Sequence, residues 1–473
     1  MGTINSAYNV IAGALDADQQ ALSVVANNVA NANTPGYTTE TPDWEQNAPV
    51  TINGMVLGAG VTETGATSQR DRVLEERLDQ QRQLAAASGA RLAALNQMQA
   101  LFPPDSGSSS SAAGDIGSDI TNFFDSFSSL EANPTDNALR EQVLSSASTL
   151  AGDISGAAGS LNQQRAALDQ EASGVASQVN SLTAAIAQLN LEIQSVSAGG
   201  DAGTLEDQRQ QDLSQLSQLI GINQVTTEDN GLSVTTTSGQ LLVSQGQSYQ
   251  LSTGTVNGVT DFFLGGVDIT SDLAGGGGQL GGYLTARDGD IPNALSALDQ
   301  LAYGISTAVN AQNNSGTDLG GVTGTAASPL YIFNEPAQVA GSAAAMTVTM
   351  TDPGQIAAAA AGAGTGDNSN ALAMAALANQ PVVSGQTPID YYSNFVSALG
   401  STVSQVQTEN TAQNASVTQL QTQRDALSGV NLNDEAAALS TLETSYQAAS
   451  QMFNILNTVM TSALNLGVET AVA

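Results

Sequence analysis

The 473-residue chain contains no cysteine and no histidine, and every one of its ten basic residues is an arginine. The absence of cysteine excludes disulfides and thiolate metal sites, and the absence of histidine removes the commonest general base and metal ligand. A Ser-His-Asp triad is therefore impossible. No constellation of residues supports an enzyme, and we expect neither a cofactor nor a metal site.

Long apolar runs and positive charge are also scarce. No run of about 18 apolar residues is present, so the sequence predicts no membrane span. The N-terminus lacks the positive segment and apolar run of a secretory signal, so a cleaved signal peptide is not expected. The net charge is −34, and all arginines lie between Arg70 and Arg424. A chain this acidic is a poor ligand for nucleic acid or for anionic membrane surfaces.

Each end of the chain instead carries apolar residues at heptad spacing. A repeat of about 3.5 residues gives a narrow stripe that is buried only against a partner helix. Both ends lack basic residues, so their association must rest on apolar burial, worth about 25 cal/mol per Å². We expect the two ends to meet each other and then other subunits. The predicted assembly interface comprises Ile4, Tyr8, Ile11, Leu15, Leu22, Val25 and Val29, and Leu439, Leu442, Tyr446, Phe453, Leu456 and Met460.

The first of these helices runs directly into an asparagine-rich stop. Asparagine tolerates the left-handed conformation that ends a helix. A Pro-Gly pair fits the central positions of a type II turn, and proline disfavours helix at the residue before it. A helix with this ending resembles the N-terminal signature of the bacterial flagellar axial proteins, which are the rod, hook and hook-associated proteins. The residues that carry the resemblance are Asn27, Asn28, Asn31, Asn33, Thr34, Pro35, Gly36 and Tyr37.

The C-terminal end resembles the hook-associated members of this family. Its motif residues are Gly429, Val430, Asn431 and Leu432, where Asn431 or Asn433 is suited to cap the following helix. Three internal segments, 123–154, 205–221 and 281–313, add to the resemblance in the right order. Hook and rod proteins do not carry such long internal helices.

The predicted fold class is α+β and mostly α, with a helical coiled-coil or bundle body formed by both chain ends and a small inserted β domain. We expect a terminal coiled-coil domain (1–40 and 428–473), a helical body (41–221 and 286–427) with short strands at 41–69 and 340–352, and a β domain at 222–285. The predicted helices are 1–33, 72–101, 119–152, 161–196, 205–220, 290–313 and 389–427.

The resemblance implies a structural subunit that forms a ring on the hook tip, at the junction between hook and filament. It implies four partners: the hook protein, a second junction protein, further copies of the chain, and a cytoplasmic export chaperone at the C-terminal helix. It places the chain outside the cell, after type III export without a cleaved signal. The alternatives are a hook or distal-rod protein and, from another class, a secreted acidic adhesin or surface-layer protein.

Overall fold

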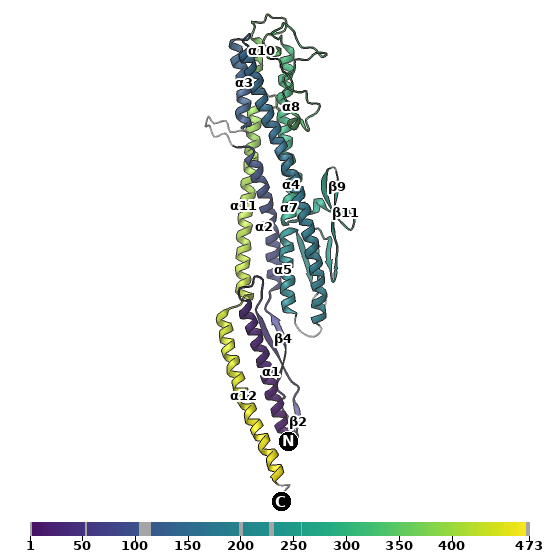
Figure 1. Cartoon of the computed structure of the whole chain (residues 1–473), viewed down its shortest axis with the longest axis vertical. Helices are drawn as coiled ribbons and strands as arrows, with labels where there is room; N and C mark the ends of the chain where they lie inside the picture. The colour runs from purple at the N-terminus through teal and green to yellow at the C-terminus, as the bar shows by residue number, and fades with distance from the viewer. Residues whose placement is uncertain are drawn as a thin grey trace.

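The computed structural model describes residues 2–52, 54–103, 115–197, 202–226, 231–256 and 258–469. The chain forms a long, mostly helical molecule in which both termini lie at the same end (Figure 1). The mostly α class of α+β fold that the sequence predicts is confirmed. Within the described ranges, no helix combines the length and the apolar character needed to cross a bilayer.

Two terminal helices and a β ribbon form the end that holds the termini, which we call the terminal module. The helices α1 (Gly2–Asn31) and α12 (Leu432–Glu469) run antiparallel, since Asn28 contacts Glu435 and the ring centroids of Tyr8 and Phe453 are 4.9 Å apart. The ribbon follows α1 and consists of two antiparallel pairs, β1 with β4 and β2 with β3. Its strands are β1 (Glu40–Gln46), β2 (Val50–Ile52), β3 (Met55–Leu57) and β4 (Val61–Ser68).

Long helices make up the body, and local sequence fixes where several of them begin. The Asp71 carboxylate accepts the backbone N–H groups of Val73 and Leu74 at the start of α2, and Thr387 precedes a proline at the start of α11. Both are standard N-cap arrangements. The body helices are α2 (Arg72–Ala100), α3 (Ile116–Ala132), α4 (Asn137–Ser197), α5 (Gly203–Leu219), α8 (Ile291–Ser315) and α11 (Pro388–Ser428).

The prediction of separate helices at 119–152 and 161–196 is wrong. The break lies instead at Pro134, between α3 and α4, because proline cannot continue a helix. The Asp136 carboxylate accepts the backbone N–H of Ala138 and so starts α4. That helix then continues unbroken for 61 residues, or about 90 Å at the helical rise.

The region predicted as a β domain is not a self-contained unit in the described residues. Only its first part is β structure, in two antiparallel sheets, and residues 270–285 form the short helices α6 and α7. Leu232 and Val234 share one hydrophobic core with Val179 of α4 and Leu216 of α5. The elements are β5 (Ile222–Thr226), β6 (Leu232–Thr236), β7 (Leu241–Ser244), β8 (Gln247–Ser248), β9 (Leu251–Val256), β10 (Val259–Leu264), β11 (Val267–Asp268), α6 (Thr270–Gly276) and α7 (Gly278–Thr285).

The segment between α8 and α11 is largely irregular. The strand expected within 340–352 does not form, because residues 342–345 make one turn of helix, α9 (Ser342–Ala345), and Val348 makes only an isolated bridge with Phe333. A further helix, α10 (Ser369–Ala376), packs beside α3. Apolar side chains of this segment join the main core of the body, which lies at the end of the molecule away from the termini.

Candidate functional site: the terminal helices and their joint to the body

The contact between α1 and α12 is thin. Among the described residues, the buried apolar cluster of this contact comprises Ala21, Val25 and Leu442, with Leu22 and Ala438 partly buried beside them. Most predicted interface residues lie at partly covered positions along the two helices. These are Ile4, Tyr8, Ile11, Leu15, Leu22, Phe453, Leu456 and Met460.

Three residues of the predicted interface remain exposed, namely Val29, Leu439 and Tyr446. Two buried alanines of α1, Ala17 and Ala21, were not among the predicted residues. Small residues four positions apart allow two helices to approach closely. They were not predicted because the heptad pattern was identified mainly from large apolar side chains. The pairing within one chain therefore uses part of the predicted surface and leaves another part open.

The motif after α1 folds as a tight turn. The backbone N–H of Thr34 donates to Asn31 O at 2.8 Å, and that of Tyr37 donates to Thr34 O at 3.2 Å. Gly36 sits at φ +87°, as the type II turn predicted for Pro35-Gly36 requires. The turn reverses the chain and directs Tyr37 back against the end of α1.

Asn28 organises this reversal from inside the protein. Its side-chain amide donates to Glu40 O at 2.8 Å and to the carboxylate Oε1 of Glu435 at 3.0 Å. Its side-chain oxygen accepts the Tyr37 hydroxyl at 2.8 Å and the backbone N–H of Glu40 at 3.0 Å. All four hydrogen-bonding positions of this buried side chain are thus used. Asn28 ties α1, the ribbon and α12 together.

Arg424, near the end of α11, connects the same turn to the body. Its guanidinium donates to Gly36 O at 2.7 Å and to Tyr37 O at 3.1 Å, and its Nε donates to the Glu75 carboxylate at 2.9 Å. Arg424 and Glu75 are both buried. A buried charge pair of this kind tolerates poorly the loss of one partner. The contact holds the turn against α2 and α11.

Further bonds fix the start of the ribbon on the body. The Thr38 hydroxyl and Arg70 both donate to the Asp207 carboxylate at the start of α5, and Arg70 also pairs with Glu206 at 3.3 Å. The backbone N–H of Thr39 donates to Ser428 O at 2.9 Å. We call residues 28–39 and 424–435, with the α2 and α5 side chains that they contact, the joint.

The C-terminal motif closes the joint from the other side. Asn431 rather than Asn433 caps α12, because its side-chain oxygen accepts the backbone N–H of Asn433 at 3.1 Å. A Cβ at Gly429 would lie 2.4 Å from the carbonyl oxygen of Asp425, so glycine is required there. The neighbouring Val430 is partly buried, and Leu432 is exposed. The two motifs, about 400 residues apart in sequence, meet at one place.

Burial governs the titration of the acidic groups in the joint. It raises the pKa of Tyr37, with Glu40, Asp207 and Glu435 adding to the shift. Burial also raises the pKa of the Glu435 carboxyl, although the hydrogen bond from Asn28 opposes the shift. The joint is a partly buried polar cluster in which the buried charges are hydrogen-bonded to their neighbours.

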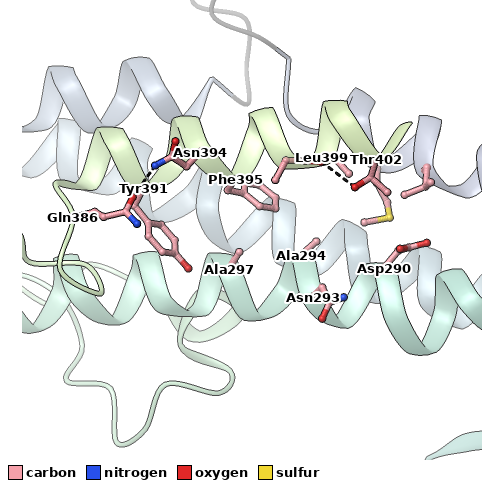
Figure 2. Close-up of a pocket in the computed structure, with 13 residues that line it drawn as sticks. Asp290, Asn293, Ala294, Ala297, Gln386, Tyr391, Asn394, Phe395, Leu399 and Thr402 are labelled. Carbon is pink, nitrogen blue, oxygen red and sulfur yellow. Dashed lines mark hydrogen bonds between the residues drawn. The ribbon is translucent and has the colours of Figure 1, made fainter. Parts of the chain in front are cut away.

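Two cavities offer alternative sites. The first, of about 400 Å³, lies between α2, α8 and α11, where Tyr391 and Phe395 point from α11 toward α8 (Figure 2). Its carboxylate, Asp290, is already bonded to Arg91 at 2.8 and 2.9 Å, and Asn394 donates to Gln386 at 2.8 Å. The second, of about 520 Å³, is polar and opens beside the turn of the joint. In the described residues, no group of acidic side chains is arranged to hold a metal ion.

Two family models match the chain. The model of the "flagellar hook-associated protein FlgK helical domain" matches residues 95–327, and that of the "flagella basal body rod protein" matches residues 9–38. The first range lies in the body, and the second spans most of α1 and the motif turn. The rod-type match is thus confined to α1 and to the motif turn, which is part of the joint.

Curated relatives named flagellar hook-associated protein 1 align over nearly the full length. The relative from Salmonella typhimurium is 26% identical over 98% of this chain and 100% of its own length, and that from Escherichia coli K12 gives the same values. The relative from Bacillus subtilis is 25% identical over 96% of each chain. The Salmonella alignment spans 561 positions, more than the 473 residues here, so that relative contains segments with no counterpart in this chain.

A solved structure, that of the flagellar hook junction protein FlgK from Burkholderia pseudomallei, has the same fold. The TM-score is 0.64 at 19% identity, and the match covers 74% of this chain and 99% of that one. Fold, joint and matches together define a structural protein of the bacterial flagellum. More specifically, the chain belongs to the family of flagellar hook-associated protein 1.

Proposed function

We propose that this chain is a structural, non-enzymatic subunit of the junction between hook and filament, which assembles through its terminal helices into a ring on the hook tip. The observation that carries the proposal is the joint. Both family motifs converge there, and they hold a thinly packed helix pair outside a body with its own core. A pair so sparsely buried is suited to complete its packing with neighbouring subunits.

The partners follow from this position in the flagellum. The proposed assembly interface comprises the apolar stripes of α1 and α12, which would contact the hook protein on one side and the second junction protein on the other. The same face of α12 would be covered by an export chaperone in the cytoplasm. Export would then proceed through the flagellar machinery without a cleaved signal. The subunits would let a stiff filament lattice grow on a bending hook.

The alternatives account for less of the chain. A hook or distal-rod protein would explain the rod-type match at 9–38, but not the hook-associated match at 95–327. A secreted adhesin or surface-layer protein of this charge would be expected to fold with calcium. Addition of a chelator distinguishes it, because only an adhesin of that kind would lose helical circular dichroism.

Deletion of the gene in the source bacterium tests the function. We expect electron microscopy to show hooks that carry no filaments, with flagellin released into the medium. Expression of the intact chain should restore the filaments. Cells that lack the chain and still grow filaments of normal number and length would refute the proposal.

A further inference from the structure

The end of the terminal module farthest from the body is poor in charged side chains, and Glu469 is the acidic residue that closes α12 there. Three segments meet there, residues 2–15, 46–62 and 444–468, and none contains an acidic or basic residue. The contacts of Tyr8 with Phe453 and of Val10 with Gly60 bring them together (Figure 1). Identical chains with a net charge of −34 repel one another, so two copies approach through uncharged segments at a lower electrostatic cost than through acidic ones.

The ribbon tip at this end is apolar and uncovered. Met55 and Val56 of β3 are 61% and 69% exposed, and Val50 of β2 is also exposed. In the described part of the chain, β2 pairs only with β3. A two-stranded hairpin is marginally stable in water, and its outer edges offer unpaired backbone groups. A second surface that packs on this tip would therefore stabilise it.

The helix α12 carries a second apolar surface beside the stripe that faces α1. Met452, Ile455 and Val459 are 55%, 62% and 47% exposed, and their spacing places them on one stripe of the helix. They alternate with Phe453 and Leu456, which are partly covered. The helix α12 thus has two apolar stripes, of which the pairing with α1 covers one.

The two open surfaces lie on different sides of α1. The helix meets α12 through Tyr8 and Val25, whereas Val10 and Gly13 lie against Gly60 and Val61 of the ribbon. The helix α1 lies between the ribbon and α12 (Figure 1). Two different surfaces on two sides of one module favour a heterologous, head-to-tail contact, which closes into a ring or continues as a helix.

We propose that the β2–β3 tip of one copy packs on the stripe of Met452, Ile455 and Val459 in α12 of the next copy. The inference rests on the proposed function only in that several copies assemble side by side. The second copy is the favoured occupant because the segments that form both surfaces, 46–62 and 444–468, contain no charged residue, so two acidic chains can meet there. Each surface would also cover exposed apolar side chains of the other.

Cross-linking tests this contact directly, because the chain contains no cysteine. Val56→Cys and Ile455→Cys are introduced together, and separately, into the full chain, and hooks isolated from producing cells are oxidised. The double variant should give a ladder of cross-linked chains on a non-reducing gel, at least about tenfold more than either single variant. A matched control combines Val56→Cys with Val267→Cys, an equally exposed position in β11, and should give no ladder.

Other outcomes overturn the proposal. Dimers formed by Ile455→Cys alone would mean that α12 packs on α12, and a cross-link to a different flagellar protein would assign the stripe to that partner. Absence of any cross-link in cells that grow normal filaments would refute the contact and leave the proposed function intact. Should the first pair of substitutions prevent assembly, Met55→Cys with Val459→Cys probes the same two surfaces under the same criteria.

Discussion

The body and the terminal module are both built of paired long helices, but they remove very different amounts of apolar surface from water. In the body, Phe123 packs against Phe127 and Phe333, with ring centroids 5.3 and 5.5 Å away, inside a continuous core. Between α1 and α12 the buried cluster reduces to Ala21, Val25 and Leu442. The body can therefore offset its chain entropy alone, whereas the terminal pair buries too little apolar surface to do so and depends on the joint. Under the proposed function, neighbouring subunits would complete its packing.

The largest expected effect separates assembly from folding. Leu442→Asp places a charge in the small cluster between α1 and α12, where no basic residue is near enough in sequence to pair with it. We expect filament growth to stop while the thermal unfolding of the body is unchanged, as measured by electron microscopy and circular dichroism. Leu456→Asp should act in the same way.

Val267→Asp is the matched control for this change, since Val267 is exposed on β11. It should leave both filaments and folding intact. A motile strain that produces Leu442→Asp at normal levels would refute the assignment of this helix to the assembly interface.

A matched pair of phenylalanine substitutions measures the difference between the two cores. Phe123→Ala removes a fully buried ring from the body and should lower the free energy of unfolding by about 3–5 kcal/mol. Phe453→Ala removes a partly exposed ring from the terminal pair and should leave the unfolding transition of the body in place. Urea unfolding followed by circular dichroism reports both values. Equal losses would show that the two regions unfold as one cooperative unit.

The joint should respond less strongly, and the response should differ between its buried and exposed asparagines. Asn28→Ala leaves the Glu40 backbone and the Glu435 carboxylate without their shared partner, at a cost of about 1–3 kcal/mol. Hydrogen exchange at the Glu40 amide should speed up accordingly. Asn33→Ala, at an exposed position of the same motif, is the control and should leave that amide protected. Similar exchange in both variants would remove Asn28 from its proposed structural role.

The sequence predicts local features better than long-range contacts. The predicted helix 72–101 is α2, 389–427 is α11, and the Pro35-Gly36 turn forms as its residues require. These helices and this turn are determined by residues close to one another in the sequence. The joint depends on Arg424, which contacts Glu75 and Gly36 across 349 and 388 residues, and apolar spacing carries no information about such pairs.

The β region shows the same limit. Its alternating Val and Thr residues predict strands, and strands form at 222–268. An alternating sequence pattern does not indicate whether the buried face of a strand packs on another sheet or on a long helix. Here Val179 and Leu216 supply that surface, so the strands of the predicted β domain share a core with the helical body. Deletion of 226–280 would therefore expose part of α4 and α5.

The last expected effect concerns pH and arises at α3 of the body. Burial raises the pKa of the Asp119 carboxyl of α3 from 3.8 to about 7, with Asp153 and Asp115 adding to the shift. The folded state then holds a proton that the unfolded state releases, so the free energy of unfolding should fall as the pH rises from about 4 to about 7 and level off above it. Asp119→Asn should flatten this slope in urea titrations, whereas Asp125→Asn, on the exposed face of the same helix, should preserve it. In the terminal pair burial also raises the pKa of Glu435, but the hydrogen bond from Asn28 opposes that shift, so the hydrogen exchange of α1 and α12 should not follow the same curve. A slope that appears equally in the exchange of α1 and α12 would mean that the two regions share their stability after all.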